Sequence, residues 1–162
     1  MSEPLHDSIR FTADRTLGRL ARMLRLLGYD TLYSPTATAA GLKESAAREG
    51  RVILIRGRLQ PRFAGIERVF GVKSEVPAEQ LAEVVRQFHL DARSGLWTRC
   101  TLCNGPIEKA EKASLESELD PEIFNLYEDF FRCQACGHVY WRGSHVNRIL
   151  ENLARILKNS GQ

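Results

Sequence analysis

All four cysteines of the chain occur in two pairs with the same spacing, Cys100 with Cys103 and Cys133 with Cys136. Two thiolates separated by two residues can bind one ion from a tight turn, and two such pairs supply the four soft ligands of a structural zinc site. A site of this kind is closed, so it has no open position for a substrate. The spacing therefore predicts a zinc site that stabilises the C-terminal region, and any catalytic chemistry must lie elsewhere.

Two other interpretations of the cysteines are a disulfide framework and a redox pair. Residues 1–7 contain acids and a proline where a secretory signal would have a basic segment followed by an apolar run. We therefore expect a reducing, cytoplasmic location, where paired CxxC motifs bind metal more often than they form disulfides. No apolar run approaches the length that spans a membrane, so we expect no membrane partner. His138 is a nearby substitute ligand, and we expect it to cap or pack the cysteine turn instead.

A second group of chemically capable residues lies where the first predicted strand meets the first predicted helix. Asp14 follows the strand at 9–13, at the edge where open parallel sheets bind their ligands. Four arginines then recur at spacings of four, three and three, on the helix face opposite the leucines. We call them the arginine strip: Arg15, Arg19, Arg22 and Arg25.

The arginine strip is not balanced by acidic residues, because none occurs between Arg15 and Tyr29. The formal charge of +3 is also uneven: residues 1–97 carry 15 Lys and Arg against 11 Asp and Glu, whereas residues 98–162 carry 8 against 9. Arginine forks match phosphate geometry, so this composition favours contact with a nucleic-acid backbone. The alternative is a solvated helix face.

The N-terminal part alternates short apolar runs with helical patterns, which is typical of a parallel α/β unit. Its most apolar run, 51–55, predicts a central strand buried on both faces. The pattern predicts strands at 9–13, 31–33, 51–55 and 69–73. It predicts helices at 16–27, 38–49, 62–68 and 77–89.

Polar, turn-forming residues at 91–95 suggest a domain boundary, and we divide the chain into an α/β domain at 1–93, a zinc ribbon at 94–143 and a C-terminal helix at 144–162. Within the ribbon, the acidic segment Glu108–Glu128 is expected to be a solvated insertion. Ser144 can cap the last helix, whose apolar stripe should dock on the first domain.

Two stretches of the chain resemble the Mut-seven C-terminal ribonuclease family, a branch of the PIN-like nucleases. The first stretch is Phe11–Asp30, and the second combines Arg99–Asn104 with Cys133–His145. The resemblance extends roughly over residues 9–150. It implies a PIN-like three-layer α/β/α sandwich with a parallel sheet, followed by a zinc ribbon and a C-terminal helix.

The resemblance also implies an acidic pocket that holds Mg²⁺ or Mn²⁺ and cleaves RNA. Asp14 matches the first acid of that pocket. Gly57, however, stands where similar sequences usually have an aspartate, and residues 34–38 supply no acid after the second strand. Glu44 and Glu79 are the candidate substitutes. A single aspartate holds Mg²⁺ poorly, so the pocket is predicted to be degenerate.

Asp30 precedes the second strand and is expected at the wrong end of the sheet for this pocket. Further arginines are expected to extend the basic surface around the ligand-binding edge: Arg51, Arg56, Arg58 and Arg62. His145, within the resembling ribbon motif, is either a polar contact to RNA or a structural residue.

Three hypotheses follow. The favoured one is an RNA-binding member of the family with impaired cleavage, acting alone or in a larger RNA–protein assembly. The second is an active metal-dependent endoribonuclease that uses substitute carboxylates. The third is a protein-interaction module built from the zinc ribbon, its acidic insertion and its aromatic residues Trp97, Tyr140 and Trp141.

Overall fold

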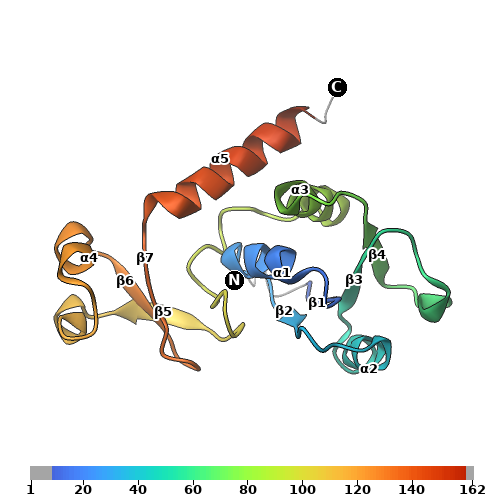
Figure 1. Cartoon of the computed structure of the whole chain (residues 1–162), viewed down its shortest axis with the longest axis horizontal. Coiled ribbons are helices and arrows are strands. Elements are labelled where there is room, and N and C mark those ends of the chain that lie inside the picture. The colour runs from blue at the N-terminus through green and yellow to red at the C-terminus, as the bar shows by residue number, and fades with distance from the viewer. Residues whose placement is uncertain (1–8, 160–162) are drawn as a thin grey trace, which may run out of the picture.

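The computed structural model describes residues 9–159 and contains two sheets at opposite ends of an elongated molecule (Figure 1). The larger sheet is fully parallel, with its strands in the order β2-β1-β3-β4. These strands are β1 Phe11–Ala13, β2 Thr31–Tyr33, β3 Val52–Arg56 and β4 Val69–Val72. The smaller sheet is antiparallel, in the order β5-β6-β7.

Helices cover both faces of the parallel sheet. On one face, α1 (Gly18–Leu26) and α3 (Pro77–Phe88) share a core with Val52 and Leu54 of β3. On the other face, Ile53 and Ile55 pack against α2 (Ala39–Glu49) and the single turn η2. Successive residues of a strand point to opposite faces, so β3 supplies both cores. This arrangement confirms the predicted three-layer α/β/α sandwich.

The predicted helix at 62–68 is wrong. The chain forms only the short 3₁₀ turn η2, Pro61–Phe63, and then Gly65 adopts a φ of +77°, which a continuing helix does not allow. The other strands and helices predicted before residue 94 are present, with ends that differ by up to two residues. The helix predicted at 144–162 is present from Ser144 to Asn159, and residues 160–162 lie outside the described residues.

The antiparallel sheet consists of β5 (Ile107–Ala110), β6 (Phe130–Cys133) and β7 (Val139–Trp141). The segment predicted to be a solvated insertion contributes to this sheet, since Glu108 lies in β5 opposite Arg132. Between β5 and β6 the chain forms η3 (Lys112–Leu115) and α4 (Pro121–Leu126), and Leu115 is fully buried. The insertion is therefore a folded part of the ribbon.

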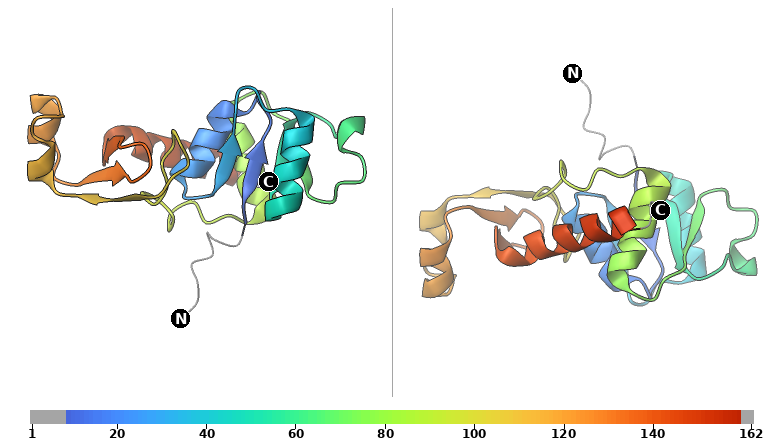
Figure 2. Two further views of the ribbon diagram at one scale, coloured as in Figure 1. Left: turned by 90° about the horizontal axis from the view of Figure 1, so that it is seen from below. Right: turned by 90° about the horizontal axis from the view of Figure 1, so that it is seen from above.

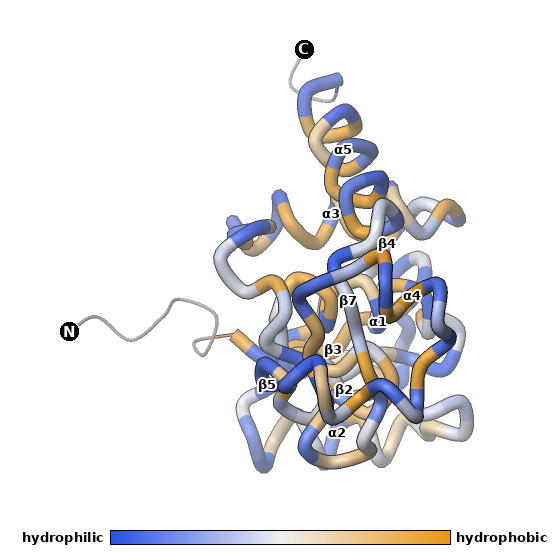
Figure 3. The backbone as a smooth tube through the Cα atoms, turned by 90° about the vertical axis from the view of Figure 1, so that its left-hand side faces the viewer, coloured by the Kyte–Doolittle hydropathy of each residue, from blue (hydrophilic) through white to orange (hydrophobic). Residues whose placement is uncertain are grey.

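The last helix, α5 (Ser144–Asn159), leaves β7 and extends back to α3 (Figures 1 and 2). Apolar residues recur along it, as the alternating colours of the tube show (Figure 3). Leu153 is buried in the core that α1 and α3 share, and Arg86 of α3 donates a hydrogen bond to the carbonyl oxygen of Ile156 at 3.1 Å. Within residues 9–159, no helix is long and apolar enough to cross a membrane.

Candidate functional site

Asp14 lies at the carboxyl end of β1, as predicted, and its carboxylate is occupied by local contacts. The backbone N–H and the hydroxyl of Thr16 both donate to Oδ1, at 2.9 and 3.0 Å. Oδ2 lies 3.7 Å from the Arg62 guanidinium. The side chain of Asp14 is only 13% exposed. It therefore holds the turn that starts α1, with one oxygen facing a cation.

The two acids considered as substitutes do not form a cluster with Asp14. Glu44 is an exposed residue of α2, 3.8 Å from Arg48, and Glu79 accepts a hydrogen bond from the Ser74 hydroxyl at 2.5 Å. Across residues 9–159, the four cysteines are the one group of three or more histidine, cysteine or acidic side chains close enough to share an ion. In the described part of the chain, the sheet edge therefore has no group of three acidic side chains close enough to share an ion.

Gly57 follows β3 with a φ of +79°, a conformation that side chains rarely adopt. A hollow of about 700 Å³ next to it has cationic residues and no acid among its lining residues Gly57, Arg58, Leu59, Phe70, Gly71 and Lys73. Arg56, also at this edge, forms an ion pair with Glu75. This part of the edge is basic, in agreement with the predicted placement of Arg56 and Arg58.

Three members of the arginine strip are exposed, Arg15, Arg19 and Arg22. None of the ion pairs within residues 9–159 involves them. They therefore present uncompensated positive charge from the carboxyl edge of the sheet along α1.

The placement of Arg25 on this exposed face is wrong. Arg25 is 4% exposed, because the turn around Cys100 covers the last turn of α1. Its guanidinium donates to the carbonyl oxygens of Thr31 at 2.8 Å, Thr101 at 3.1 Å and Leu102 at 2.8 Å. Burial lowers the pKa of Arg25 from its usual value. This arginine joins the ribbon to the α/β unit and does not face solvent.

The expected position of Arg51 at the ligand-binding edge of the sheet is also wrong. It precedes β3, at the amino edge of the sheet, and is 4% exposed. Its guanidinium forms a two-pronged ion pair with Asp30, at 2.7 and 3.0 Å, and a second ion pair with Glu49. The Asn104 amide donates to Asp30 at 2.7 Å, and its carbonyl accepts from the Thr31 backbone N–H at 3.0 Å. Asp30 is therefore structural, at the end of the sheet where it was expected.

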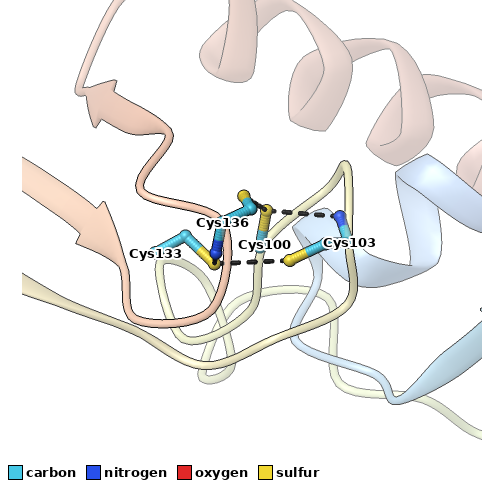
Figure 4. Close-up of side chains that lie close together, drawn as sticks. All are labelled: Cys100, Cys103, Cys133 and Cys136. Carbon is cyan, nitrogen blue, oxygen red and sulfur yellow. Dashed lines mark hydrogen bonds between the residues drawn. The ribbon is translucent and has the colours of Figure 1, made fainter.

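The four cysteine sulfurs converge between the ribbon and α1 (Figure 4). Cys100 and Cys136 have sulfurs 3.7 Å apart, those of Cys103 and Cys133 are 3.4 Å apart, and all four lie within 4.8 Å of one another. Sulfurs around tetrahedral zinc, with Zn–S bonds of about 2.3 Å, are about 3.8 Å apart, whereas a disulfide brings them to about 2.05 Å. The geometry fits zinc.

Hydrogen bonds to the sulfurs support the same interpretation. The backbone N–H groups of Cys103 and Cys136 donate to the sulfurs of Cys100 and Cys133, each at 3.4 Å, and the Tyr140 hydroxyl lies 3.0 Å from the Cys100 sulfur. Burial raises the pKa of the Cys100 thiol, but the donors around its sulfur outweigh burial and lower that pKa to about 6. Cys100 can therefore act as a thiolate ligand at neutral pH.

A groove of about 770 Å³ brings together three predicted site residues, Arg19, Arg22 and His145. It lies where α1, the start of α3, the ribbon and the first turns of α5 meet. The sequence placed Arg19 and Arg22 together in the arginine strip and His145 separately, and it did not indicate the groove, because its walls come from segments far apart in the sequence. His138 also lines the groove and packs edge-on against Tyr140, with ring centres 4.8 Å apart.

The fold and the cysteine site together define an α/β/α protein with a parallel sheet and a ribbon whose four cysteines are positioned to bind a metal ion. The Mut7-C RNAse domain matches residues 9–157, so the chain belongs to the Mut7-C RNAse domain family. Comparison with the curated proteins gives no significant match, and neither does comparison with the solved structures.

Proposed function

We propose that the protein binds RNA through the exposed arginines of α1 and that its acidic pocket is too incomplete for efficient cleavage. One observation carries this proposal: Arg15, Arg19 and Arg22 are exposed and form no ion pair with the described residues. Asp14, beside Arg15, belongs to no group of acidic side chains within residues 9–159 that could share an ion. Arginine forks bind phosphates in two-pronged geometry, and this contact needs no catalytic carboxylate.

The chemistry of cleavage argues for the second part of the proposal. Metal-assisted phosphodiester hydrolysis requires oxygen ligands that hold hard cations and organise the attacking water. Asp14 supplies one carboxylate, and Thr16 and Arg62 already contact its two oxygens. Mg²⁺ bound by one such ligand would keep most of its waters and be held weakly.

Zinc has a structural part in this proposal. Four thiolates close the coordination sphere, so the cysteine site would stabilise the ribbon without activating water. The ribbon in turn supplies the groove that Arg19 and Arg22 line. Metal binding would therefore maintain the RNA-binding surface indirectly.

The proposal is tested by replacing Arg15, Arg19 and Arg22 together with alanine. Binding of a single-stranded RNA, followed over a series of salt concentrations, should weaken, and the slope of log affinity against log salt should fall by about 2. A control variant removes three exposed arginines that lie outside α1 and outside the groove lining, Arg10, Arg68 and Arg155. Equal affinities for both triple variants and the unaltered protein would refute the assigned surface.

A second candidate, a metal-dependent endoribonuclease, is favoured by the family match itself. It requires that bound RNA or metal bring further acidic side chains next to Asp14, into positions that they do not occupy in the structure. Cleavage that depends on Mn²⁺ and is lost in Asp14→Asn would support this candidate over the first.

A further inference from the structure

The groove between α1 and the ribbon has a lining that neither the zinc site nor Asp14 explains. Its floor and walls are mostly apolar, with Met23 and Leu26 of α1 facing residues of β7 and α5 such as Val139 and Ile149. Val76, at the start of α3, is 50% exposed within it. A volume of about 770 Å³ lies in the range of roughly 300–1,000 Å³ typical of ligand sites.

The two arginines that line this groove are both cationic, and two histidines accompany them. Arg19 and Arg22 stand three residues apart on one face of α1, and His138 and His145 lie on the ribbon and α5. The lining contains no aspartate or glutamate. A ligand that fits it must combine apolar, flat surface with negative charge.

Aromatic rings form part of the groove lining, and they differ in how closely neighbouring side chains pack against them. Trp97 stacks on Phe131 with ring centres 5.4 Å apart, and the Tyr140 hydroxyl is next to the Cys100 sulfur. Trp141 is half-buried, and its ring is tilted at 35° to Tyr127, with ring centres 6.2 Å apart. The Trp141–Tyr127 contact is longer and less parallel than the Trp97–Phe131 stack, so Trp141 is the more loosely packed of the two tryptophans in the groove.

We propose that this groove binds the unpaired bases of single-stranded RNA, with their phosphates on Arg19 and Arg22. The inference rests on the proposed RNA-binding function and adds where the bases lie. Bases offer flat apolar faces and phosphates offer the negative charge, which is the combination that the lining requires. A duplex keeps its bases stacked inside, so it cannot place them in an apolar groove.

The position of the groove relative to Asp14 supports this assignment. Arg15 lies beside Asp14 at the carboxyl edge of the sheet, and α1 then carries Arg19 and Arg22 away from that edge to the groove. The Tyr33 hydroxyl donates to the Arg15 carbonyl at 3.1 Å and fixes the start of this path. One strand of RNA can thus contact all three arginines and place its next bases in the groove.

The test measures binding of a uridine decamer and of a duplex of equal length to the full chain. Trp141→Ala should weaken decamer binding roughly 5- to 100-fold, the effect of one lost stacking contact, and Trp141→Phe should restore most of it. Duplex binding should change less than twofold in either variant. Zinc content and circular dichroism of each variant check that the ribbon is folded.

A second pair of variants tests the same groove without altering an aromatic residue. Val146, on the first turn of α5, is half-buried and lines the groove. Val146→Glu places a carboxylate in the groove that Arg19 and Arg22 line and should weaken decamer binding at least tenfold, whereas Val146→Gln, of the same shape, should weaken it less. Equal effects of the two substitutions would contradict a role for phosphate at this position.

The outcomes separate the inference from the function on which it rests. One outcome is that the decamer binds the unaltered protein and loses affinity only when Arg15, Arg19 and Arg22 are replaced together with alanine. In that case the groove assignment is wrong and the RNA-binding function stands. If neither RNA binds the unaltered protein, both fail. If Val146→Glu instead abolishes self-association seen in light scattering, and RNA binding is unaffected, the groove binds a second copy of the chain and the inference is overturned.

Discussion

The Arg25 guanidinium donates a hydrogen bond to the carbonyl oxygen of Leu102 at 2.8 Å, across 77 positions of sequence. Leu102 lies between Cys100 and Cys103, so the last turn of α1 holds the first cysteine turn directly. Asn104 adds a second connection through Asp30 and the Thr31 backbone. Hydrogen bonds therefore join the cysteine turn directly to α1 and to the start of β2.

The first prediction concerns Arg25. Arg25→Met leaves three carbonyl oxygens without their donor and should lower the free energy of unfolding by about 2 to 3 kcal/mol. Under conditions where the variant is folded, RNA affinity should stay within twofold of the unaltered protein, unlike that of Arg22→Ala. Denaturant titration and RNA binding on the same samples measure both. A large loss of affinity in the folded variant would return Arg25 to the RNA-binding surface.

The second prediction concerns zinc. Cys136→Ser removes one of the four ligands and should release the metal. Because Arg25 and Asn104 connect the cysteine turn to α1 and β2, we expect amide hydrogen exchange to accelerate in the C-terminal half of α1 as well as in the ribbon. The control is Ala135→Ser, an exposed position in the same turn. Fewer than one zinc per chain in unaltered protein purified without chelator would remove the basis for this prediction.

The third prediction concerns pH. Burial raises the pKa of Asp30, but hydrogen bonds from Arg51 and Asn104 outweigh burial and hold that pKa below its usual value. A depressed folded-state pKa stabilises the fold above the unfolded value of about 4, and the contribution is lost as pH falls through the folded-state pKa. Asp30→Asn should therefore cost about 1 to 3 kcal/mol at pH 7 and progressively less below pH 4. Denaturant unfolding at several pH values measures this; a constant difference would contradict it.

The fourth prediction concerns Gly57. A Cβ at this position meets no atom within 4 Å, so Gly57→Asp is opposed only by the left-handed backbone, at about 1 kcal/mol. We expect tighter Mn²⁺ binding than in Gly57→Asn, measured by calorimetry, because the new carboxylate follows β3 at the edge that holds Asp14. Cleavage should not appear, since residues 34–38 still supply no acid. RNA cleavage by this variant would show that two carboxylates suffice.

The sequence predicted most of the fold because its determinants are local. The continuous apolar run of β3 and the leucine face of α1 each define an element and its buried side, and the cysteine spacing defines a metal turn. The prediction of a helix at 62–68 was wrong because of a local feature: Gly65 adopts a left-handed conformation that residues other than glycine rarely adopt.

The candidate site was less predictable because its determinants are distant in sequence. The spacing of the four arginines describes one helix face and cannot show that the turn at Thr101 and Leu102 covers the last of them. The groove likewise depends on how α5 returns from the ribbon to α3. Asp14 was placed correctly, yet its contact with Arg62 depends on the irregular segment before β4.

The length of labelled RNA recovered after incubation with the protein tests the central proposal most directly. A single-stranded RNA bound to the unaltered chain in the presence of Mn²⁺ should be recovered intact, and Asp14→Asn, which keeps an oxygen acceptor for Thr16, should bind it equally well. Shortened RNA in the sample with unaltered protein, and intact RNA with Asp14→Asn, would contradict the proposal and establish Asp14 as part of a working metal-dependent site.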